Sequence, residues 1–292
     1  EKTMQNIGMQ LFSLPKLLEE DFPAALDLLH QMGYRKLEFY GPFAFSDETV
    51  RQNWRSLAPA LGFNGSGCFG YSPEDMQLLL QDYDLKAPAL HTDLITLQNH
   101  MGPLAETCHL LGTEYVGIAA IPLELRPNLD GYKKVAEIFN KVGEAARSNG
   151  LKYYYHNHGY GLQEVEGHIP LQLIFSQTDP DLVYFEMDIY WTRAGGANPK
   201  EYLERYGNRY HLMHLKDMKE EKQFSGDGGD PQQWMELFPF MTTAGDGVLD
   251  LKGIIAKATE IGVKHFFVEQ DMVANPETAL KASFDYLKNL TF

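Results

Sequence analysis

Cysteine is one of the scarcest residues in this chain. Its 292 residues include only Cys68 and Cys108, and no CxxC pair occurs. Redox motifs and zinc ribbons are built on such pairs, so neither is expected. A disulfide between the two cysteines would require the fold to bring them together. Long apolar runs are absent as well, since no stretch approaches the roughly 20 residues of a membrane span.

Basic residues are also in short supply. The 25 lysines and arginines stand against 40 aspartates and glutamates, which gives a formal net charge of −15. A surface that binds nucleic acid has to be basic because it faces phosphates, and an anionic membrane makes a similar demand. We therefore expect neither partner. Uncharged sugars and cationic ligands remain compatible with this composition.

An initiator methionine is missing, because the first residue is Glu1. Something upstream was removed, either a signal peptide or the rest of a cloned gene. A signal peptide would make the protein exported or periplasmic; otherwise we expect it in the cytoplasm. No low-complexity tract or linker divides the chain. With 44% hydrophobic residues it can bury a large core, and we expect a single domain over residues 1–292.

Segments typical of strands and of helices alternate along the chain. Short apolar runs predict strands, and longer runs with helical spacing, some of them ended by glycine, predict helices. Eight such alternations favour a (β/α)8 TIM barrel. The rival is an open doubly wound sheet, which would have a glycine-rich phosphate loop after the first strand, and this chain has none. Two loops are enlarged, at about 41–71 and about 219–247. The expected strands are 5–11, 36–40, 87–91, 115–119, 151–156, 182–187, 210–215 and 264–269, and the expected helices are 22–32, 47–61, 73–83, 96–111, 130–148, 170–177, one from residue 199, 250–261 and 276–290.

The stretch 151–158 ends in two histidines. Because side chains alternate across a strand, Tyr154, His156 and His158 are expected on one side of it. Two imidazoles at the end of an apolar strand indicate a metal site or a proton-transfer site. The alternative is a pair of structural histidines that bond to the backbone. This stretch by itself favours neither interpretation.

Other predicted strands also end in polar residues. Strands five to eight end near His156, Asp188, His214 and Glu269, and strand three ends at His91. In a barrel the active site lies at the carboxyl ends of the strands, so these side chains should meet at one rim. Asp, His and Glu ligands suit a catalytic divalent cation, and Zn, Mn, Co and Mg are not distinguishable on this basis. The alternative is that the carboxylates cap the helices that follow.

The motifs around these residues carry a family resemblance. Asp188 lies in Met-Asp-Ile-Tyr-Trp, His214 in His-Leu-Lys-Asp, and Glu269 in Val-Glu-Gln. In this order, over nearly the whole chain, they resemble the sugar phosphate isomerase/epimerase family of xylose-isomerase-like TIM barrels. The strand-five motif Tyr-His-Asn-His-Gly-Tyr, followed by Asp-Ile-Tyr-Trp-Thr-Arg-Ala-Gly-Gly, is similar to a bacterial subgroup of that family.

The resemblance implies a metal site made of two glutamates, an aspartate and a histidine. Asp188, His214 and Glu269 match three of these positions. At the end of strand five, where the family has its first glutamate, this chain has His156, with Tyr155 or His158 there if the alignment shifts. We therefore expect one divalent metal ion, bound by His156 together with the three matching residues.

The same resemblance implies removal of a proton next to a sugar carbonyl, with the metal stabilising the charge that develops. Glu269 is the expected general base, and Lys216 would bind a substrate oxygen or stabilise an enolate. His158 would be the second acid or base, because a metal-bound imidazole has no free lone pair. The main expectation is a sugar isomerase or epimerase. The alternative is a lyase or hydratase that eliminates from a keto-sugar or a 3-keto-glycoside.

Residues near the predicted rim are expected to bind the substrate. Gln10 and Glu38 end strands one and two and would bind hydroxyl groups, as would His91. Trp191 and Arg193 follow the aspartate ligand and are expected at the pocket mouth, where the indole would stack on a sugar or simply pack on the rim. No cluster of lysines and arginines marks a phosphate subsite, so the expected substrate is an unphosphorylated carbohydrate.

Two further hypotheses come from other functional classes. A related barrel nuclease would need more metal ligands and a basic groove, which the net charge of −15 disfavours. A non-catalytic sugar-binding barrel with a decayed metal site is motivated by the missing glutamate on strand five. Barrels of this kind often pair, so a homo-oligomer is compatible with the chain, although no sequence feature demands one.

Overall fold

A computed structural model describes residues 1–292 as a closed parallel barrel of eight strands. Around the barrel the strands follow the order β1-β10-β7-β6-β5-β4-β3-β2, and each pairs with its neighbours in parallel. This closure confirms the predicted (β/α)8 architecture. The strands are β1 (Gly8–Gln10), β2 (Lys36–Tyr40), β3 (Lys86–Thr92), β4 (Tyr115–Ile118), β5 (Lys152–His156), β6 (Val183–Asp188), β7 (Tyr210–Leu215) and β10 (His265–Val268).

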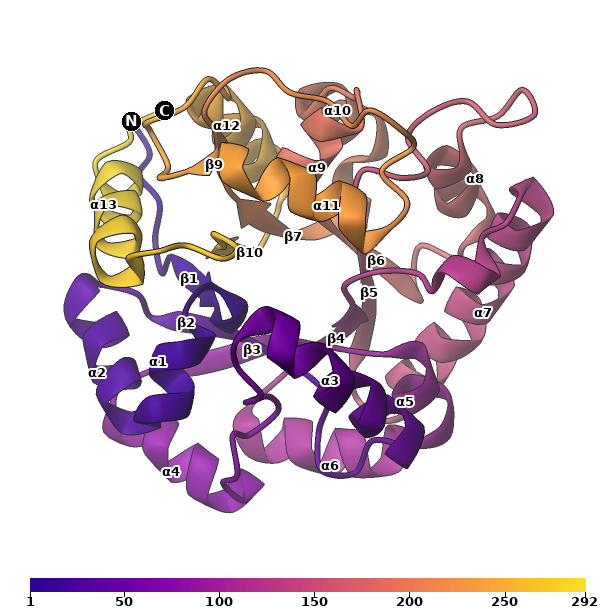
Figure 1. The fold of residues 1–292 in the computed structure, drawn as a ribbon. Coiled ribbons are helices and arrows are strands. Elements are labelled where there is room, and N and C mark those ends of the chain that lie inside the picture. Colours follow the sequence, from indigo (N-terminus) through magenta and orange to yellow (C-terminus); the bar gives the residue numbers. More distant parts are fainter.

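Helices surround the barrel, and the two chain ends lie next to each other (Figure 1). Their starts follow ordinary capping chemistry: the Ser72 hydroxyl accepts from the Asp75 N–H at 3.0 Å, and Pro73 opens the helix. The helices are α1 (Pro15–Glu20), α2 (Phe22–Met32), α3 (Glu48–Leu61), α4 (Pro73–Asp82), α5 (Leu94–Asn99), α6 (Met101–Leu111), α7 (Leu129–Ser148), α8 (Pro170–Gln177), α9 (Ile189–Ala194), α10 (Pro199–Tyr206), α11 (Pro231–Leu237), α12 (Leu251–Ile261) and α13 (Pro276–Lys288).

Two elements differ from the sequence-based expectation. The helix predicted over 96–111 is two helices, α5 and α6, because the backbone of His100 leaves the helical region with φ of −133°. Asp93 starts the first of them by accepting from the Thr96 N–H at 2.9 Å. The first strand is also shorter than the predicted 5–11, since a 3-10 turn begins at Leu11. Neither change alters the order of elements around the barrel.

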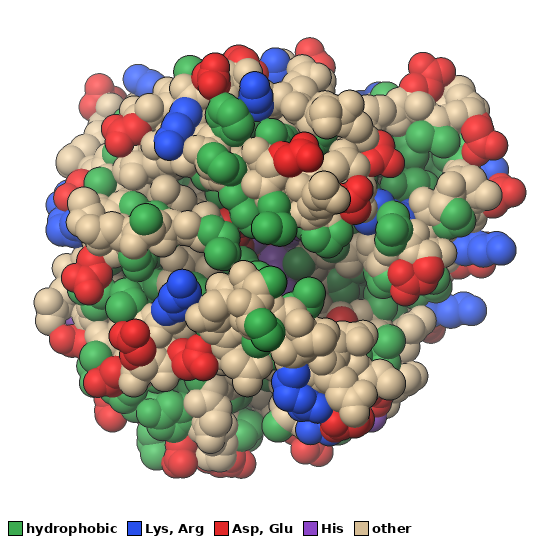
Figure 2. Space-filling view, viewed as in Figure 1, with side chains coloured by type: hydrophobic (Ala, Val, Ile, Leu, Met, Phe, Trp, Pro, Cys, Tyr) green, Lys and Arg blue, Asp and Glu red, His purple; other side chains and the backbone are tan.

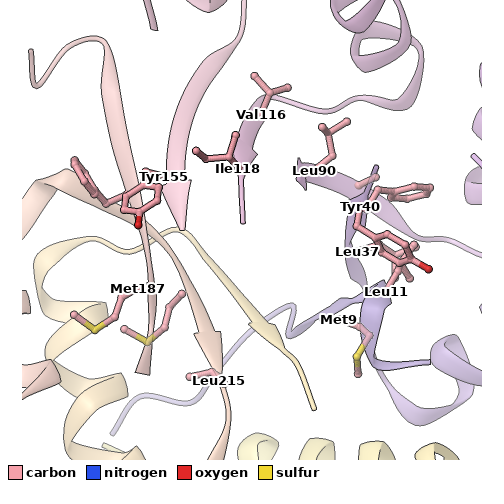
Figure 3. Packing of buried hydrophobic residues seen from close by; sticks show 14 of the residues in the cluster. Met9, Leu11, Leu37, Tyr40, Leu90, Val116, Ile118, Tyr155, Met187 and Leu215 are labelled. Atoms are coloured by element: carbon pink, nitrogen blue, oxygen red, sulfur yellow. The ribbon is translucent and has the colours of Figure 1, made fainter. Parts of the chain in front are cut away.

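The main core lies between the barrel strands and the helices. Figure 3 shows buried hydrophobic side chains of this core, among them Leu37, Leu90, Val116 and Met187 from four different strands. Side chains from five strands form a separate apolar cluster inside the barrel, so the barrel is a packed core rather than a pore. That cluster consists of Ala89, Tyr115, Tyr154, Leu212 and Phe267.

The segment 219–247 after β7 contains structure of its own. It includes α11 and the strand β9 (Met241–Thr242), which pairs with β8 (Asp217–Met218). The Asp217 carboxylate accepts the backbone N–H groups of Gly245 and Gly247, at 2.9 and 3.1 Å. A β-carbon on Gly247 would lie 2.3 Å from that carboxylate, so glycine is required there. Asp217 thereby anchors this loop beside the barrel mouth.

No helix of the structure combines the length and the apolar character that crossing a membrane would require.

Candidate metal centre and active site

The ends of β5, β6, β7 and β10 bring the four predicted metal ligands to one place. His156, Asp188 and His214 are at most 2% exposed and Glu269 is 7% exposed. Figure 2 shows a hollow in the middle of the viewed face, with histidine at its floor. The ligand atoms of the first three residues lie within 4.8 Å of one another. The parallel register explains this, because Asp188 pairs with His214 across β6 and β7.

The ring of His156 is oriented by the backbone. Its Nδ1 lies 2.9 Å from the carbonyl oxygen of Ala119 and has to donate to it, because a carbonyl only accepts. Its Nε2 then points at Asp188 Oδ2, 3.1 Å away. This arrangement places a ring nitrogen, rather than a carboxylate, at the strand-five position.

The ring of His214 is oriented by buried glutamates. Its Nε2 lies 2.5 Å from Glu38 Oε1 and 3.0 Å from Glu186 Oε1. Its Nδ1 is buried without a hydrogen-bond partner, 3.5 Å from Asp188 Oδ2 and 3.3 Å from Glu269 Oε1. A carboxylate that accepts from one ring nitrogen directs the other nitrogen toward a metal ion. The unpartnered Nδ1 between two carboxylates therefore fits a divalent cation.

The donor set agrees with that assignment. Nitrogen from His156 and His214, and oxygen from Asp188 and Glu269, are ligands that zinc and other first-row divalent ions accept. Burial alone would raise the pKa of Asp188, but Lys216 and the two histidines lower it well below its usual range. The carboxylate is thus ionised and able to bind a cation at neutral pH.

A second group of acids and histidines lies deeper in the barrel. Glu38, His91, Glu186 and His214 also have ligand atoms within 4.8 Å of one another, but these atoms are joined by hydrogen bonds. His91 Nε2 donates to Glu186 Oε1 at 2.8 Å and lies 3.3 Å from Glu38 Oε2. Burial opposes the charge on this ring, but the two glutamates raise the pKa of His91 to about 9. We interpret the group as the support of His214 rather than as a separate metal site.

Lys216 lies directly among the predicted ligands. Its Nζ is 2.7 Å from Asp188 Oδ2 and 3.2 Å from Asp271 Oδ2, and it forms a third ion pair with Glu269 Oε1. Burial disfavours the ammonium charge, but these three carboxylates raise the pKa of Lys216 well above its usual value. The side chain is therefore a charged donor facing the site.

His158 is held between two tryptophans. Its ring stacks on Trp234 with centroids 4.1 Å apart and on Trp191 at 5.3 Å. Its Nδ1 is buried without a hydrogen-bond partner. Burial, reinforced by the neighbouring His156, lowers the pKa of His158 well below its usual value. His158 is thus a neutral imidazole beside the site, in a form that can accept a proton.

The structure places the predicted substrate-binding residues at different depths. Gln10, Glu38 and His91 are at most 5% exposed; Gln10 Nε2 donates to Glu38 Oε1 at 2.9 Å, so they form the floor of the site. Trp191 was expected at the mouth, and that location is wrong, because its ring is 1% exposed. Arg193 does reach the outside, where it pairs with Glu221 at 2.9 Å. Sugar binding by these residues stays a prediction.

Sequence reasoning missed two residues of the site. Asp271, two positions after Glu269, bonds to Lys216, and burial together with the Glu269 charge raises its pKa to about 7. The sequence did contain a signal for Asp271, because residues two positions apart lie on the same side of an extended chain. Trp234 had no such signal, because it comes from α11, far along a long loop, and only the fold brings it onto His158.

Two curated relatives carry the name inosose dehydratase. An inosose dehydratase of Clostridium perfringens is 33% identical over 172 residues, which spans 56% of this chain and 56% of that protein. This chain therefore matches little more than half the length of that relative. An inosose dehydratase of Clostridium botulinum is 31% identical over 277 residues, which covers 83% of this chain and 90% of the relative.

Solved structures share the fold over almost the full length. A sugar phosphate isomerase/epimerase from Parabacteroides distasonis superposes with a TM-score of 0.76 at 24% identity, covering 99% of this chain and 96% of the other. An IOLI protein with a bound zinc atom superposes with a TM-score of 0.69 at 17% identity, covering 98% and 99%. A family model described as a xylose isomerase-like TIM barrel matches residues 26–290. The resemblance found in the sequence is confirmed, and the chain belongs to the xylose isomerase-like TIM barrel family.

Proposed function

We propose that the protein is a metal-dependent lyase acting on an uncharged keto-polyol or keto-sugar. It would remove a proton from the carbon next to the carbonyl and a hydroxyl group from the adjoining carbon, which together leave as water. The observation that carries the proposal is the end of β5, where His156 and His158 stand in place of a carboxylate. An epimerase needs a base on each face of the reacting carbon, and the sequence supplies only one matching glutamate. The relatives named inosose dehydratase support elimination over the isomerisation that the motifs first suggested.

One divalent ion is proposed at His156, Asp188, His214 and Glu269. When bound, it supplies positive charge that polarises a carbonyl and stabilises the negative charge that develops beside it. The chain's own contribution is orientation: Glu38 fixes the ring of His214 and the Ala119 carbonyl fixes that of His156, as the hydrogen bonds described above require. Zinc is compatible with this donor set, as are manganese and cobalt.

Glu269 is the proposed general base. Burial would raise the pKa of Glu269, but Lys216 and His214 lower it below its usual range, so the carboxylate is ionised. Its Oε1 contacts both Lys216 and His214, which leaves Oε2 as the oxygen to receive a proton from carbon. Lys216 is proposed to donate to the substrate oxygen next to that carbon.

His158 is the proposed second acid or base. It is neutral and stacks on Trp191 and Trp234, and its ring centroid lies 5.3 Å from that of His156. A neutral imidazole in this position can receive the proton that Glu269 takes from carbon and deliver it to the leaving hydroxyl, which departs as water.

The substrate class is inferred from the charges around the site. Lys216 already has three carboxylate partners, and Arg193 pairs with Glu221 outside. A phosphate group calls for several basic side chains, whereas Lys216 is a single lysine shared among carboxylates. The proposed chemistry needs a substrate with two neighbouring oxygens that can chelate the metal and a C–H next to a carbonyl. A cyclic or open-chain polyol with one carbonyl group has both.

A deuterium experiment tests the reaction type. The protein is loaded with Mn²⁺, Co²⁺ or Zn²⁺ and incubated in D₂O with a keto-inositol and with simple ketohexoses, and the products are followed by NMR and mass spectrometry. We expect loss of one water from the keto-inositol. Exchange of the C–H with the carbon skeleton and all hydroxyls intact would instead support an isomerase or epimerase. If the metal is bound but neither C–H exchange nor loss of water occurs, the result would support a sugar-binding barrel.

A further inference from the structure

Lys216 pairs with two of the carboxylates that are proposed to bind the metal. Its ammonium contacts Asp188 Oδ2 at 2.7 Å and also pairs with Glu269 Oε1, and both residues are proposed metal ligands. The other oxygen of the aspartate, Oδ1, accepts from the backbone N–H of Trp191 at 3.0 Å. The ammonium and a metal ion would thus require the same carboxylate oxygens.

Burial makes it costly for the ammonium and a metal ion to compete for the same carboxylate oxygens. Lys216 and its three carboxylate partners are each at most 8% exposed, so water cannot neutralise any of these charges. Three buried carboxylates without a cation repel one another, and a buried ammonium next to a dication is repelled in the same way. The group therefore needs positive charge, but the two cations cannot both contact the same oxygens.

We propose that Lys216 is a built-in counter-cation of the metal centre, which a divalent ion must displace from Asp188 and Glu269 in order to bind. This inference rests on the proposed metal site. It adds that the affinity for metal is set partly by how strongly the lysine holds the carboxylates. The protein without metal then keeps a neutralised, folded site, and the lysine becomes available to a substrate oxygen only when the metal arrives.

Asp271 can keep an ion pair with the displaced ammonium. Its Oδ2 lies 3.2 Å from Lys216 Nζ, and it is not among the proposed ligands. The indole of Trp191 also lies near the lysine, with its ring centroid 5.4 Å from Lys216 Nζ. An ammonium that gives up Asp188 and Glu269 can thus keep one carboxylate and one aromatic face, and it does not have to leave the site.

Titration calorimetry with Mn²⁺ and Zn²⁺ on the chelator-treated protein tests the proposal. Lys216→Met removes the charge but keeps the length of the side chain, and we expect metal affinity to rise about tenfold or more. Lys216→Arg keeps the charge and can bind a carboxylate through two parallel hydrogen bonds, so its metal affinity should fall. Lys200→Met is the matched control: this exposed lysine pairs only with Asp250, at 2.8 Å, and its loss should leave the affinity unchanged.

Thermal unfolding gives a readout that does not depend on activity. Without metal, Lys216→Met should unfold at a lower temperature than the unmodified protein, because three buried carboxylates lose their cation. Saturating metal should raise its unfolding temperature by more than it raises that of the unmodified protein, because a ligand that binds the folded state more tightly stabilises it more at the same concentration. If Lys216→Met does not fold without metal, refolding with and without Mn²⁺ gives the same comparison.

A double-mutant cycle tests the role of Asp271. Asp271→Asn removes a negative charge near the metal, so it should weaken metal binding in either background. If Asp271 also receives the displaced ammonium, the loss is larger with Lys216 present than in the Lys216→Met background. Equal losses would overturn this part of the proposal.

The outcomes separate this inference from the proposed function. Unchanged or weaker metal binding by Lys216→Met, with metal binding by the unmodified protein, overturns the inference alone. Metal binding by Lys216→Met but not by the unmodified protein supports the inference and removes the metal from the proposed function. Absence of metal binding by both proteins overturns both.

Discussion

The two ends of the barrel interior use the same residue types to opposite effect. At the carboxyl ends of the strands, His91 and His214 face buried glutamates that raise their pKa values above the usual range. At the other end, His211 and His265 face tyrosine and lysine. Burial and neighbouring lysines lower the pKa of each to about 4. Carboxylates therefore favour the charged form of His91 at one end, whereas burial and lysines favour the neutral rings of His211 and His265 at the other.

Neighbouring strands explain the contrast. His211 and His214 are three residues apart on β7, but the first accepts from the Tyr115 hydroxyl at 2.8 Å and the second contacts Glu38 and Glu186. His265, at the start of β10, accepts from the Lys36 ammonium at 2.9 Å. A histidine on a barrel strand is therefore no evidence for a metal site until the partners of both ring nitrogens are known.

The largest effect is expected at the carboxyl end, from Glu269→Gln. The amide keeps the shape of the side chain but cannot accept a proton as a base, so turnover should fall by about 10²–10⁴-fold or more. The measurement is the rate of water loss from a keto-inositol at saturating metal, with the unfolding temperature as a check on the fold. Glu260→Gln, an exposed glutamate that pairs with Lys257, is the control and should keep full activity. Full activity in Glu269→Gln would remove its role as the base.

The second prediction tests whether the buried glutamates orient His214. Glu38→Gln should weaken metal binding by about 10- to 100-fold, because the histidine loses the carboxylate that directs its Nδ1 to the metal. Calorimetric titration with Zn²⁺ measures the change. Glu114→Gln is the matched control at the opposite end of the barrel, where the glutamate pairs with Lys152 and touches no proposed ligand. A metal affinity that is the same in both variants would contradict the supporting role.

The smallest effect concerns stability at the opposite end. The folded pKa values of His211 and His265 are about 4, below the ordinary value of about 6.5, so between these limits the unfolded chain binds more protons than the folded one. Stability from the two neutral rings is therefore complete near pH 7 and is lost as pH falls from about 6.5 to about 4. Because both rings are partly exposed and solvent screens them, the expected loss is on the order of 1 kcal/mol.

Denaturant unfolding at pH 7.5 and pH 5 measures this loss in the unmodified protein and in a His211→Gln/His265→Gln variant. Other groups titrate in the same range, so the informative quantity is the difference between the two proteins. We expect the variant to lose less stability between the two pH values. An equal loss in both proteins would mean that these histidines do not carry the effect.

Much of the site could be predicted from the sequence. Strand alternation placed Tyr154 and His156 on one side of β5, and the interior contacts of both side chains agree with it. The ends of consecutive strands meet in any closed parallel barrel, so the positions of Asp188, His214 and Glu269 followed once the eight alternations were recognised. The carboxyl-end site was thus predictable because it depends on local periodicity and on one topological rule.

Other features depended on contacts between distant segments. The sequence gives no indication that Trp234, in a loop 76 positions after His158, stacks on that histidine, nor that the ring of Trp191 is buried. Glu38 was expected to bind substrate hydroxyls, yet its carboxylate is occupied by His214, Gln10 and Tyr154. These outcomes depend on which side chains meet across the barrel, which no local pattern encodes.

The sequence by itself determined the barrel and the set of residues at its mouth, because hydrophobic periodicity and strand order are properties of the chain. Only the tertiary structure decided the charge and direction of each side chain there. It turned Lys216 onto three carboxylates and left His214 Nδ1 without a partner. The physical reason is that a buried charge is governed by the few groups within about 4 Å of it, and those groups come from other strands.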